Sequence, residues 1–223
     1  EESMSKTVRP YGEWPSPIAS EAVASAGISL RQADADGADI YWVEGRPSDG
    51  GRCVLVRRDA AGVTKDVLGA PWSVRTRAHE YGGGEFLAHD GVVYFSQDDD
   101  QRLCRVAPGE EPTPLTPAGP WRYADAAFDA TRGRVICVRE DHGVDGEPDC
   151  RLVSIDAQGS SDALVFPCES DFVSSPRVSP CGGRLVWITW DHPNMPWDGT
   201  SLWVADLDGE GRPGKPERVA GGE

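Results

Sequence analysis

The chain has 223 residues, of which 37 are Asp or Glu and 22 are Lys or Arg, so its formal net charge is −15. This charge and the lack of a basic cluster argue against nucleic acid as a partner, because nucleic-acid sites neutralise phosphates with Lys and Arg. No run approaches the roughly 18 consecutive apolar residues of a membrane-spanning helix, so no membrane partner is expected. A chain of this length can form one all-β domain with a sizeable core.

The N-terminus and the cysteines bear on the origin of the chain. The first residue is Glu1 and not Met, so we expect a segment of a longer chain, and targeting upstream of Glu1 stays open. Six cysteines occur without a Cys-x-x-Cys pair, and several alternate with apolar residues, at positions 53, 104, 137, 150, 168 and 181. This pattern favours buried free thiols in a reducing compartment over disulfides or a zinc site, and it predicts a cytoplasmic location.

A Gly-based turn followed by an apolar strand recurs four times along the chain. The strands that follow these turns are Ile40–Val43, Val92–Phe95, Val135–Val138 and Leu185–Ile188. The glycines of the turns, Gly37, Gly91, Gly133 and Gly183, lie 54, 42 and 50 residues apart. Each copy continues through a polar loop into a third strand and a weaker fourth strand. Four antiparallel strands in a repeat of this length are typical of a β-propeller blade.

We therefore predict an all-β chain whose residues 1–223 form a partial N-terminal β-propeller of about four four-stranded blades. The predicted blades cover about 18–70, 78–118, 121–168 and 174–223, and their first strands begin near Ile28, Glu85, Ala126 and Pro176. Propellers close with about four to eight blades, so a closed ring and an arc of a larger ring both stay open. An irregular β-sandwich is the remaining alternative.

The loops between the second and third strands are charged and vary in length. Propeller geometry places them on the same rim as the connections between blades, which makes this rim the expected binding face. The residues in question are 44–51, 97–101, 141–149 and 191–198, together with the connection 75–84.

Three features of this rim have a functional and a structural interpretation. Asp98, Asp99 and Asp100 could bind calcium, but they lack the alternating spacing of a calcium loop, so a solvated turn is favoured. His142 and His192 each follow an Asp and could act as paired bases, although a local hydrogen bond is favoured. The glycines 82–84 could approach a phosphate, but no helix follows them, which favours a close backbone crossing.

The sequence contains no candidate nucleophile. No Gly-x-Ser-x-Gly occurs, and the segment 159–162 lacks both the closing Gly and the strand-turn-helix setting of a nucleophilic serine. We expect no catalytic residue in this chain, and no metal or cofactor.

Five segments in order along the chain together resemble the prolyl oligopeptidase family of serine peptidases, in particular its dipeptidyl aminopeptidase and acylaminoacyl-peptidase branch. They are Tyr11–Ile18, Ile40–Pro47, Arg75–Gly84, Cys137–His142 and Thr189–Gly199. The resemblance implies a seven-bladed propeller that covers an α/β-hydrolase domain with a Ser-Asp-His triad, a domain that is absent from these 223 residues.

The resemblance further implies the substrate-gating part of a serine exopeptidase or acyl-peptide hydrolase that acts on peptide or aminoacyl-amide bonds. Its expected partners are the α/β-hydrolase domain of the same parent chain and a small peptide or aminoacyl substrate. The alternative is a non-enzymatic β-propeller that binds a protein partner through its acidic rim.

Two polar and aromatic segments of the rim are the predicted substrate-binding residues. They are His79, Glu80 and Tyr81 from the connection, and Asp191, His192, Asn194, Trp197 and Asp198 from the last loop. A carboxylate among them could pair with the α-ammonium group of a substrate. Equally, these residues could dock the propeller on the hydrolase domain.

Overall fold

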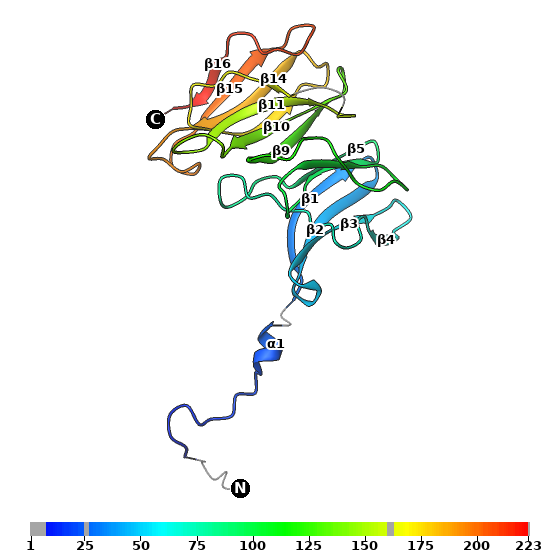
Figure 1. The fold of residues 1–223 in the computed structure, drawn as a ribbon, viewed down its shortest axis with the longest axis vertical. Helices are drawn as coiled ribbons and strands as arrows, with labels where there is room; N and C mark the ends of the chain where they lie inside the picture. Colours follow the sequence, from blue (N-terminus) through cyan, green and yellow to red (C-terminus); the bar gives the residue numbers. More distant parts are fainter. Residues whose placement is uncertain (1–7, 25–26, 160–162, 223) are drawn as a thin grey trace.

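The structure, a computed structural model, describes residues 8–24, 27–159 and 163–222. A short helix, α1 (Ser20–Ala24), belongs to an N-terminal segment that extends away from the rest of the chain (Figure 1). Within the described ranges no helix has both the length and the apolar character needed to cross a membrane.

The strands form four antiparallel sheets of four strands each, and their spatial order follows the chain. The first sheet contains β1 (Ser29–Asp36), β2 (Asp39–Arg46), β3 (Arg52–Arg58) and β4 (Thr64–Asp66), with the 3-10 helix η1 (Pro47–Asp49) between β2 and β3. The second contains β5 (Phe86–His89), β6 (Val92–Ser96), β7 (Leu103–Val106) and β8 (Thr113–Pro114). The third contains β9 (Trp121–Asp129), β10 (Arg134–Asp141), β11 (Asp149–Asp156) and β12 (Leu164–Val165). The fourth contains β13 (Phe172–Val178), β14 (Arg184–Trp190), β15 (Ser201–Asp206) and β16 (Glu217–Gly221).

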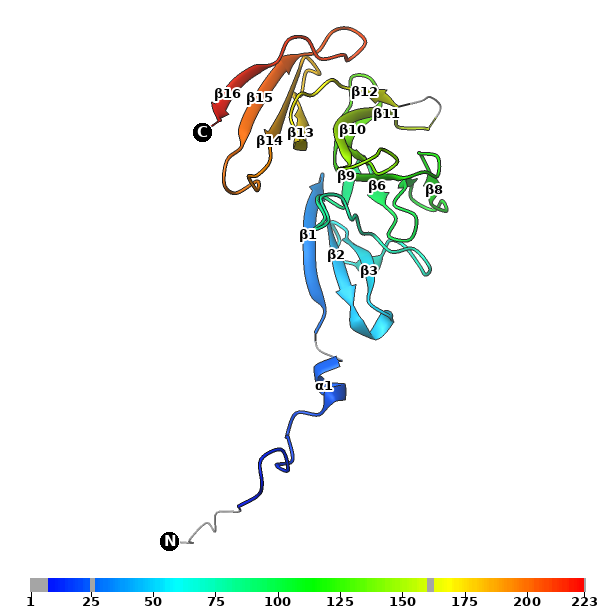
Figure 2. The same ribbon diagram turned by 60° about the vertical axis from the view of Figure 1, so that its left-hand side comes forward.

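The sheets meet one another through their first strands. β1 contacts β5, β5 contacts β9, and β9 contacts β13. Each sheet is therefore one blade, numbered 1 to 4 along the chain, and the first strands line the inside of the arc. Figures 1 and 2 show the blades following one another without closing into a ring. The prediction of an all-β arc of four four-stranded blades is confirmed.

The hairpin turns follow from local backbone chemistry. In blade 2 the turn between β5 and β6 places both Asp90 and Gly91 at positive φ, 49° and 77°. Two successive positive φ values define a type I′ turn, whose twist matches that of antiparallel strands and which favours Asp-Gly. The dipeptide Asp90-Gly91 therefore fixes the register of this hairpin.

The starts of two first strands differ from the prediction. β1 and β5 begin at Ser29 and Phe86, close to the predicted positions, whereas β9 and β13 begin at Trp121 and Phe172. In both β9 and β13 the pairing with the next strand shifts register, and Asp125 and Ser175 lie at positive φ there. Each strand therefore continues on the N-terminal side of a β-bulge, which breaks the alternation that the sequence pattern relies on.

Three clusters of buried apolar side chains fill the three interfaces between the blades. Phe95 and Leu55 belong to the cluster between blades 1 and 2, Tyr123 to that between blades 2 and 3, and Val138 and Leu185 to that between blades 3 and 4. The core of a propeller lies between its blades, because a single blade cannot bury both of its faces.

The cysteines only partly match the sequence prediction. Cys53, Cys104, Cys137 and Cys150 are buried free thiols, as predicted. Cys181 is exposed, so the prediction was wrong there. It lies in the turn before β14, outside the alternating apolar pattern, where its Sγ contacts the Ser179 hydroxyl at 3.4 Å.

The two ends of the arc carry exposed apolar side chains. On blade 1, Leu30 is 73% and Ile40 is 49% exposed, and on β16 of blade 4 Val219 is 59% exposed. Between the inner blades the corresponding faces are covered by the next blade. These uncovered ends are what an arc of a larger ring presents.

Polar side chains join the inner strands of neighbouring blades. Asp36 of β1 accepts hydrogen bonds from the backbone N–H groups of Asp90 and Gly91, at 3.1 and 2.6 Å. The carboxylate of Asp125 in β9 accepts one hydrogen bond from the Gly84 N–H and another, at 3.1 Å, from the Ser175 N–H. Asp125 thus connects the start of blade 2, blade 3 and blade 4 through two backbone donors.

The connection between β4 and β5 touches all four blades. Val74 N–H donates to the Cys53 carbonyl in blade 1, and Arg75 N–H donates to the Ser96 carbonyl in blade 2. The Thr76 hydroxyl donates to the Tyr123 carbonyl in blade 3 at 2.6 Å. The segment then reaches blade 4, where it forms one wall of a cleft lined by residues of blades 3 and 4.

Candidate functional site

A cleft of about 850 Å³ lies at the rim formed by the blade 1 to blade 2 connection and the loops of blades 3 and 4. Its residues come from segments 79–81, 140–151, 169–172 and 190–195. This is the rim that the loop pattern predicted as the binding face. The cleft exists because the connection crosses blade 3 and its side chains meet those of blade 4.

His79 lies in the aromatic part of this cleft. Its ring centroid is 5.7 Å from that of Tyr81 in a stacked arrangement, 5.2 Å from that of Trp190, and 6.1 Å from that of Phe172. The backbone of His79 and that of Glu80 are held at φ values of 55° and 61°. Such values are uncommon for residues other than glycine and are found where surrounding contacts fix the backbone.

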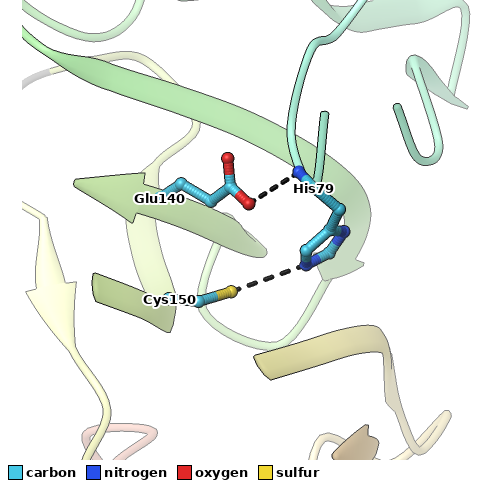
Figure 3. A group of neighbouring side chains, drawn as sticks. All are labelled: His79, Glu140 and Cys150. Carbon is cyan, nitrogen blue, oxygen red and sulfur yellow. Dashed lines mark hydrogen bonds between the residues drawn. The ribbon is translucent and has the colours of Figure 1, made fainter. Parts of the chain in front are cut away.

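Glu140 and Cys150 lie on the same side of His79, with Glu140 near its backbone N–H and Cys150 near its ring (Figure 3). They face each other across β10 and β11 in the register of blade 3. The Glu140 carboxylate accepts a 2.6 Å hydrogen bond from the His79 N–H, and its other oxygen lies 3.1 Å from His142 Nε2. Cys150 Sγ lies 3.5 Å from His79 Nε2.

Burial determines the charges in this group. Burial lowers the pKa of His79, although Glu140 and Asp125 act in the opposite direction. Burial also raises the pKa of the Cys150 thiol to about 12. At neutral pH His79 is therefore a neutral imidazole and Cys150 a protonated thiol.

Carboxylates line the outer part of the cleft. Three of them are paired: Glu80 with Arg122 at 2.6 Å, Asp149 with Arg151 at 2.5 Å, and Asp171 with His192 at 3.1 Å. Glu147 and Glu169 also line the cleft, and neither has an ion-pair partner among the described residues. The cleft therefore combines an aromatic floor with an acidic wall, which suits a cationic ligand with an apolar or aromatic body.

The structure contains no assembled serine nucleophile in the part of the chain that it describes. Among residues 8–24, 27–159 and 163–222 no serine hydroxyl is hydrogen-bonded to a histidine ring; the side-chain partners of the ring nitrogens are Glu140, Cys150, Asp171 and, for His89, Asp90. The segment 160–162, which the sequence analysis compared with a nucleophile motif, lies outside the described residues.

Comparison with solved structures gives two closely similar enzymes. A puromycin hydrolase superimposes with a TM-score of 0.86 at 36% sequence identity, over 97% of this chain and 36% of its own. A puromycin-hydrolyzing peptidase from Mycobacterium tuberculosis superimposes with a TM-score of 0.85 at 38% identity, again over 97% of this chain and 36% of its own. A prolyl endopeptidase with 14% identity and a TM-score of 0.59 shares the fold.

This chain belongs to the prolyl oligopeptidase family. It spans about a third, 36%, of the length of the puromycin-hydrolysing structures that it matches. No family model matches the sequence, and no curated protein does. The structure identifies the chain as a propeller portion of a prolyl oligopeptidase-family protein, in agreement with the resemblance of the five sequence segments.

The structure brings together five of the eight predicted site residues of this family propeller. His79, Glu80, Tyr81, His192 and Asn194 line the cleft. Asp191, Trp197 and Asp198 belong to the same loop but do not line it: Asp191 accepts the Asp171 N–H at 2.8 Å, and Asp198 accepts the Met195 N–H at 3.0 Å.

In the dipeptides Asp141-His142 and Asp191-His192, the histidine ring does not contact the aspartate before it. His142 contacts Glu140 and not Asp141, whereas His192 contacts Asp171 and not Asp191. The side chain that precedes each histidine points elsewhere because neighbours alternate along an extended chain. Each histidine has a carboxylate partner, 2 residues away for His142 and 21 residues away for His192, so the Asp-His hydrogen bond favoured by the sequence is not formed in either case.

The other two ambiguous features also have structural roles. Asp98 pairs with Arg77 at 3.0 Å and Asp100 with Arg102 at 2.6 Å, so two of the three aspartates form ion pairs with arginines. A Cβ added to Gly84 would lie 2.8 Å from the Asp125 carboxylate and 3.2 Å from its Cα. The Gly82–Gly84 run is thus a close crossing of the connection over β9.

Sequence reasoning missed Glu140, Cys150, Glu147 and Glu169 as residues of one site. The segment Cys137–His142 supported the family resemblance, and Cys150 was interpreted only as a buried thiol. His79 is 61 residues from Glu140 and 71 residues from Cys150. A signal did exist, because Glu140 follows the apolar run Val135–Val138 in the same strand, and a carboxylate buried there must find a partner.

Proposed function

We propose that this chain is the substrate-gating propeller of a serine exopeptidase or acyl-peptide hydrolase, whose α/β-hydrolase domain with the catalytic triad belongs to the same parent protein. The observation that carries the proposal is the 36% to 38% identity to two puromycin-hydrolysing enzymes over 97% of the chain. The cytoplasmic location stays a prediction.

The cleft supports a role in substrate selection. We infer that its acidic wall binds the α-ammonium group of a small peptide or aminoacyl amide, and that the rings beside His79 contact the adjoining side chain. Glu147 and Glu169 are the strongest candidates for the ammonium because no cation in the described residues neutralises them. Glu80 contributes less, since Arg122 already pairs with it. Asp191, Trp197 and Asp198 would contact larger substrates from the edge of the cleft.

A matched pair of substrates tests this proposal in the parent protein. Puromycin and N-acetylpuromycin differ only in the free amine. If the cleft binds this amine as an ammonium group, kcat/KM for puromycin should be about tenfold or more above that for the acetylated compound. Equal values would contradict amine recognition, and turnover of only the acetylated compound would indicate an acyl-peptide hydrolase. A parent protein that hydrolyses neither compound nor any aminoacyl or acyl-aminoacyl amide would favour the non-enzymatic binding module.

A further inference from the structure

We propose that His79, Glu140 and Cys150 form a binding site for Zn²⁺ at the inner end of the cleft. The three residues offer one imidazole nitrogen, one carboxylate oxygen and one sulfur, and these atoms all lie within 4.8 Å of one another. Figure 3 shows the three side chains converging from the connection, β10 and β11. Zinc is bound in proteins by these three kinds of donor.

The spacing of the sulfur and nitrogen donors fits the size of this ion. With Zn–S of about 2.3 Å and Zn–N of about 2.0 Å at a tetrahedral angle, the sulfur and nitrogen lie about 3.5 Å apart. Cys150 Sγ and His79 Nε2 are 3.5 Å apart. Glu140 and Cys150 are directly opposite in the register of β10 and β11, which places their side chains on one face of blade 3. The backbone therefore holds the donor positions together before any metal binds.

The partners of Glu140 orient this ligand. One carboxylate oxygen accepts the His79 N–H, and the other contacts His142 Nε2. Hydrogen bonds of this kind to a ligating group fix its orientation and are a regular feature of metal sites. Each carboxylate oxygen keeps a second lone pair that it can offer to a cation.

Metal binding changes the protonation of the site. The imidazole of His79 can offer a nitrogen lone pair, and the Cys150 thiol must lose its proton to form the Zn–S bond. We therefore expect the release of one proton for each Zn²⁺ bound.

The donor set also selects the class of metal. Ca²⁺ and Mg²⁺ take oxygen ligands, whereas a thiolate and an imidazole favour Zn²⁺ and its neighbours in the first transition series. His79 and Glu140 line the cleft, so a fourth position, for water or a ligand atom, would face it. Three protein ligands with one open position are typical of zinc sites that contact a ligand.

Cobalt titration tests this proposal, because Co²⁺ occupies zinc sites and a thiolate ligand gives it a charge-transfer absorption in the near ultraviolet. The full chain, treated with chelator and reductant, is titrated with Co²⁺ and then with Zn²⁺. We expect one Co²⁺ per chain with the thiolate band, loss of that band as Zn²⁺ displaces cobalt, and a higher Tm in the presence of Zn²⁺.

The variants identify the ligands. Cys150→Ser keeps the size of the side chain and a hydrogen bond to His79, and it should remove the thiolate band. His79→Gln should weaken the binding of Co²⁺ at least about 100-fold. Cys137→Ala, a buried thiol elsewhere in β10, is the matched control and should keep both the band and the affinity. Circular dichroism verifies that each variant is folded. An unaltered protein that binds Co²⁺ without a thiolate band, or binds none, would overturn the proposal, as would a band that persists in Cys150→Ser.

Discussion

The double variant Glu147→Gln/Glu169→Gln of the parent protein is expected to raise KM for puromycin about tenfold or more and to leave KM for N-acetylpuromycin nearly unchanged. Both carboxylates line the cleft, and neither is paired within the described residues. A charge-assisted hydrogen bond to the substrate ammonium contributes about 1.5–3 kcal/mol, and the open cleft favours the lower end of this range. The acetylated compound has no ammonium to lose, so the effect should depend on the substrate. Steady-state kinetics with both compounds measures it.

A second double variant controls for the loss of net charge. Glu110→Gln/Asp206→Asn also removes two negative charges, from side chains that pair with Arg105 and Arg184 and do not line the cleft. It should leave both KM values unchanged. Equal losses on both substrates in the cleft variant, together with a lower Tm, would show that Glu147 and Glu169 support domain docking and do not bind the amine.

Asp125→Ala is expected to destabilise the propeller by about 3 kcal/mol, because it removes two charge-assisted hydrogen bonds to backbone donors and leaves those donors unsatisfied. The donors are the N–H groups of Gly84, just before β5 of blade 2, and of Ser175, within β13 of blade 4. The residue also lies at a φ of 54°, a conformation that Asp tolerates better than Ala. Urea denaturation, followed by far-ultraviolet circular dichroism, gives the change in the midpoint.

Two further substitutions separate these contributions. Asp125→Asn keeps one acceptor oxygen and the tolerance of positive φ, so it should lose clearly less stability than Asp125→Ala. Asp145→Ala, on the exposed loop between β10 and β11, should change the free energy of unfolding by less than about 0.5 kcal/mol. If Asp125→Ala is as stable as Asp145→Ala, the blades do not depend on this carboxylate.

The fold was predictable because the hairpins of each blade are indicated by short sequence patterns. The turn glycines and the alternating strands after them, such as Val92–Phe95, indicate hairpins without reference to distant residues. The bulges at Asp125 and Ser175 were not predictable, since both lie in hydrogen bonds between blades: the Asp125 carboxylate accepts the N–H groups of Gly84 and Ser175. The sequence pattern therefore predicted the four four-stranded blades but placed the starts of β9 and β13 several residues late.

The candidate site was predictable only where one segment contributes several of its residues. His79, Glu80 and Tyr81 stand together in the sequence, and their aromatic and polar character marked them. Glu140 and Cys150 did not stand out, because the alternation of β10 and β11 is compatible with ordinary buried positions. Only the crossing of the connection over blade 3 brings His79 to them.

We propose that these 223 residues select the substrate and that catalysis takes place in another part of the parent protein. The position of the nucleophilic serine tests this proposal most directly. The parent protein is labelled with a fluorophosphonate probe, which modifies activated serines, and the labelled peptide is identified by mass spectrometry. We predict one stoichiometrically labelled serine outside residues 1–223 and no labelling of the 223-residue chain alone. A labelled serine within residues 1–223 would contradict the account.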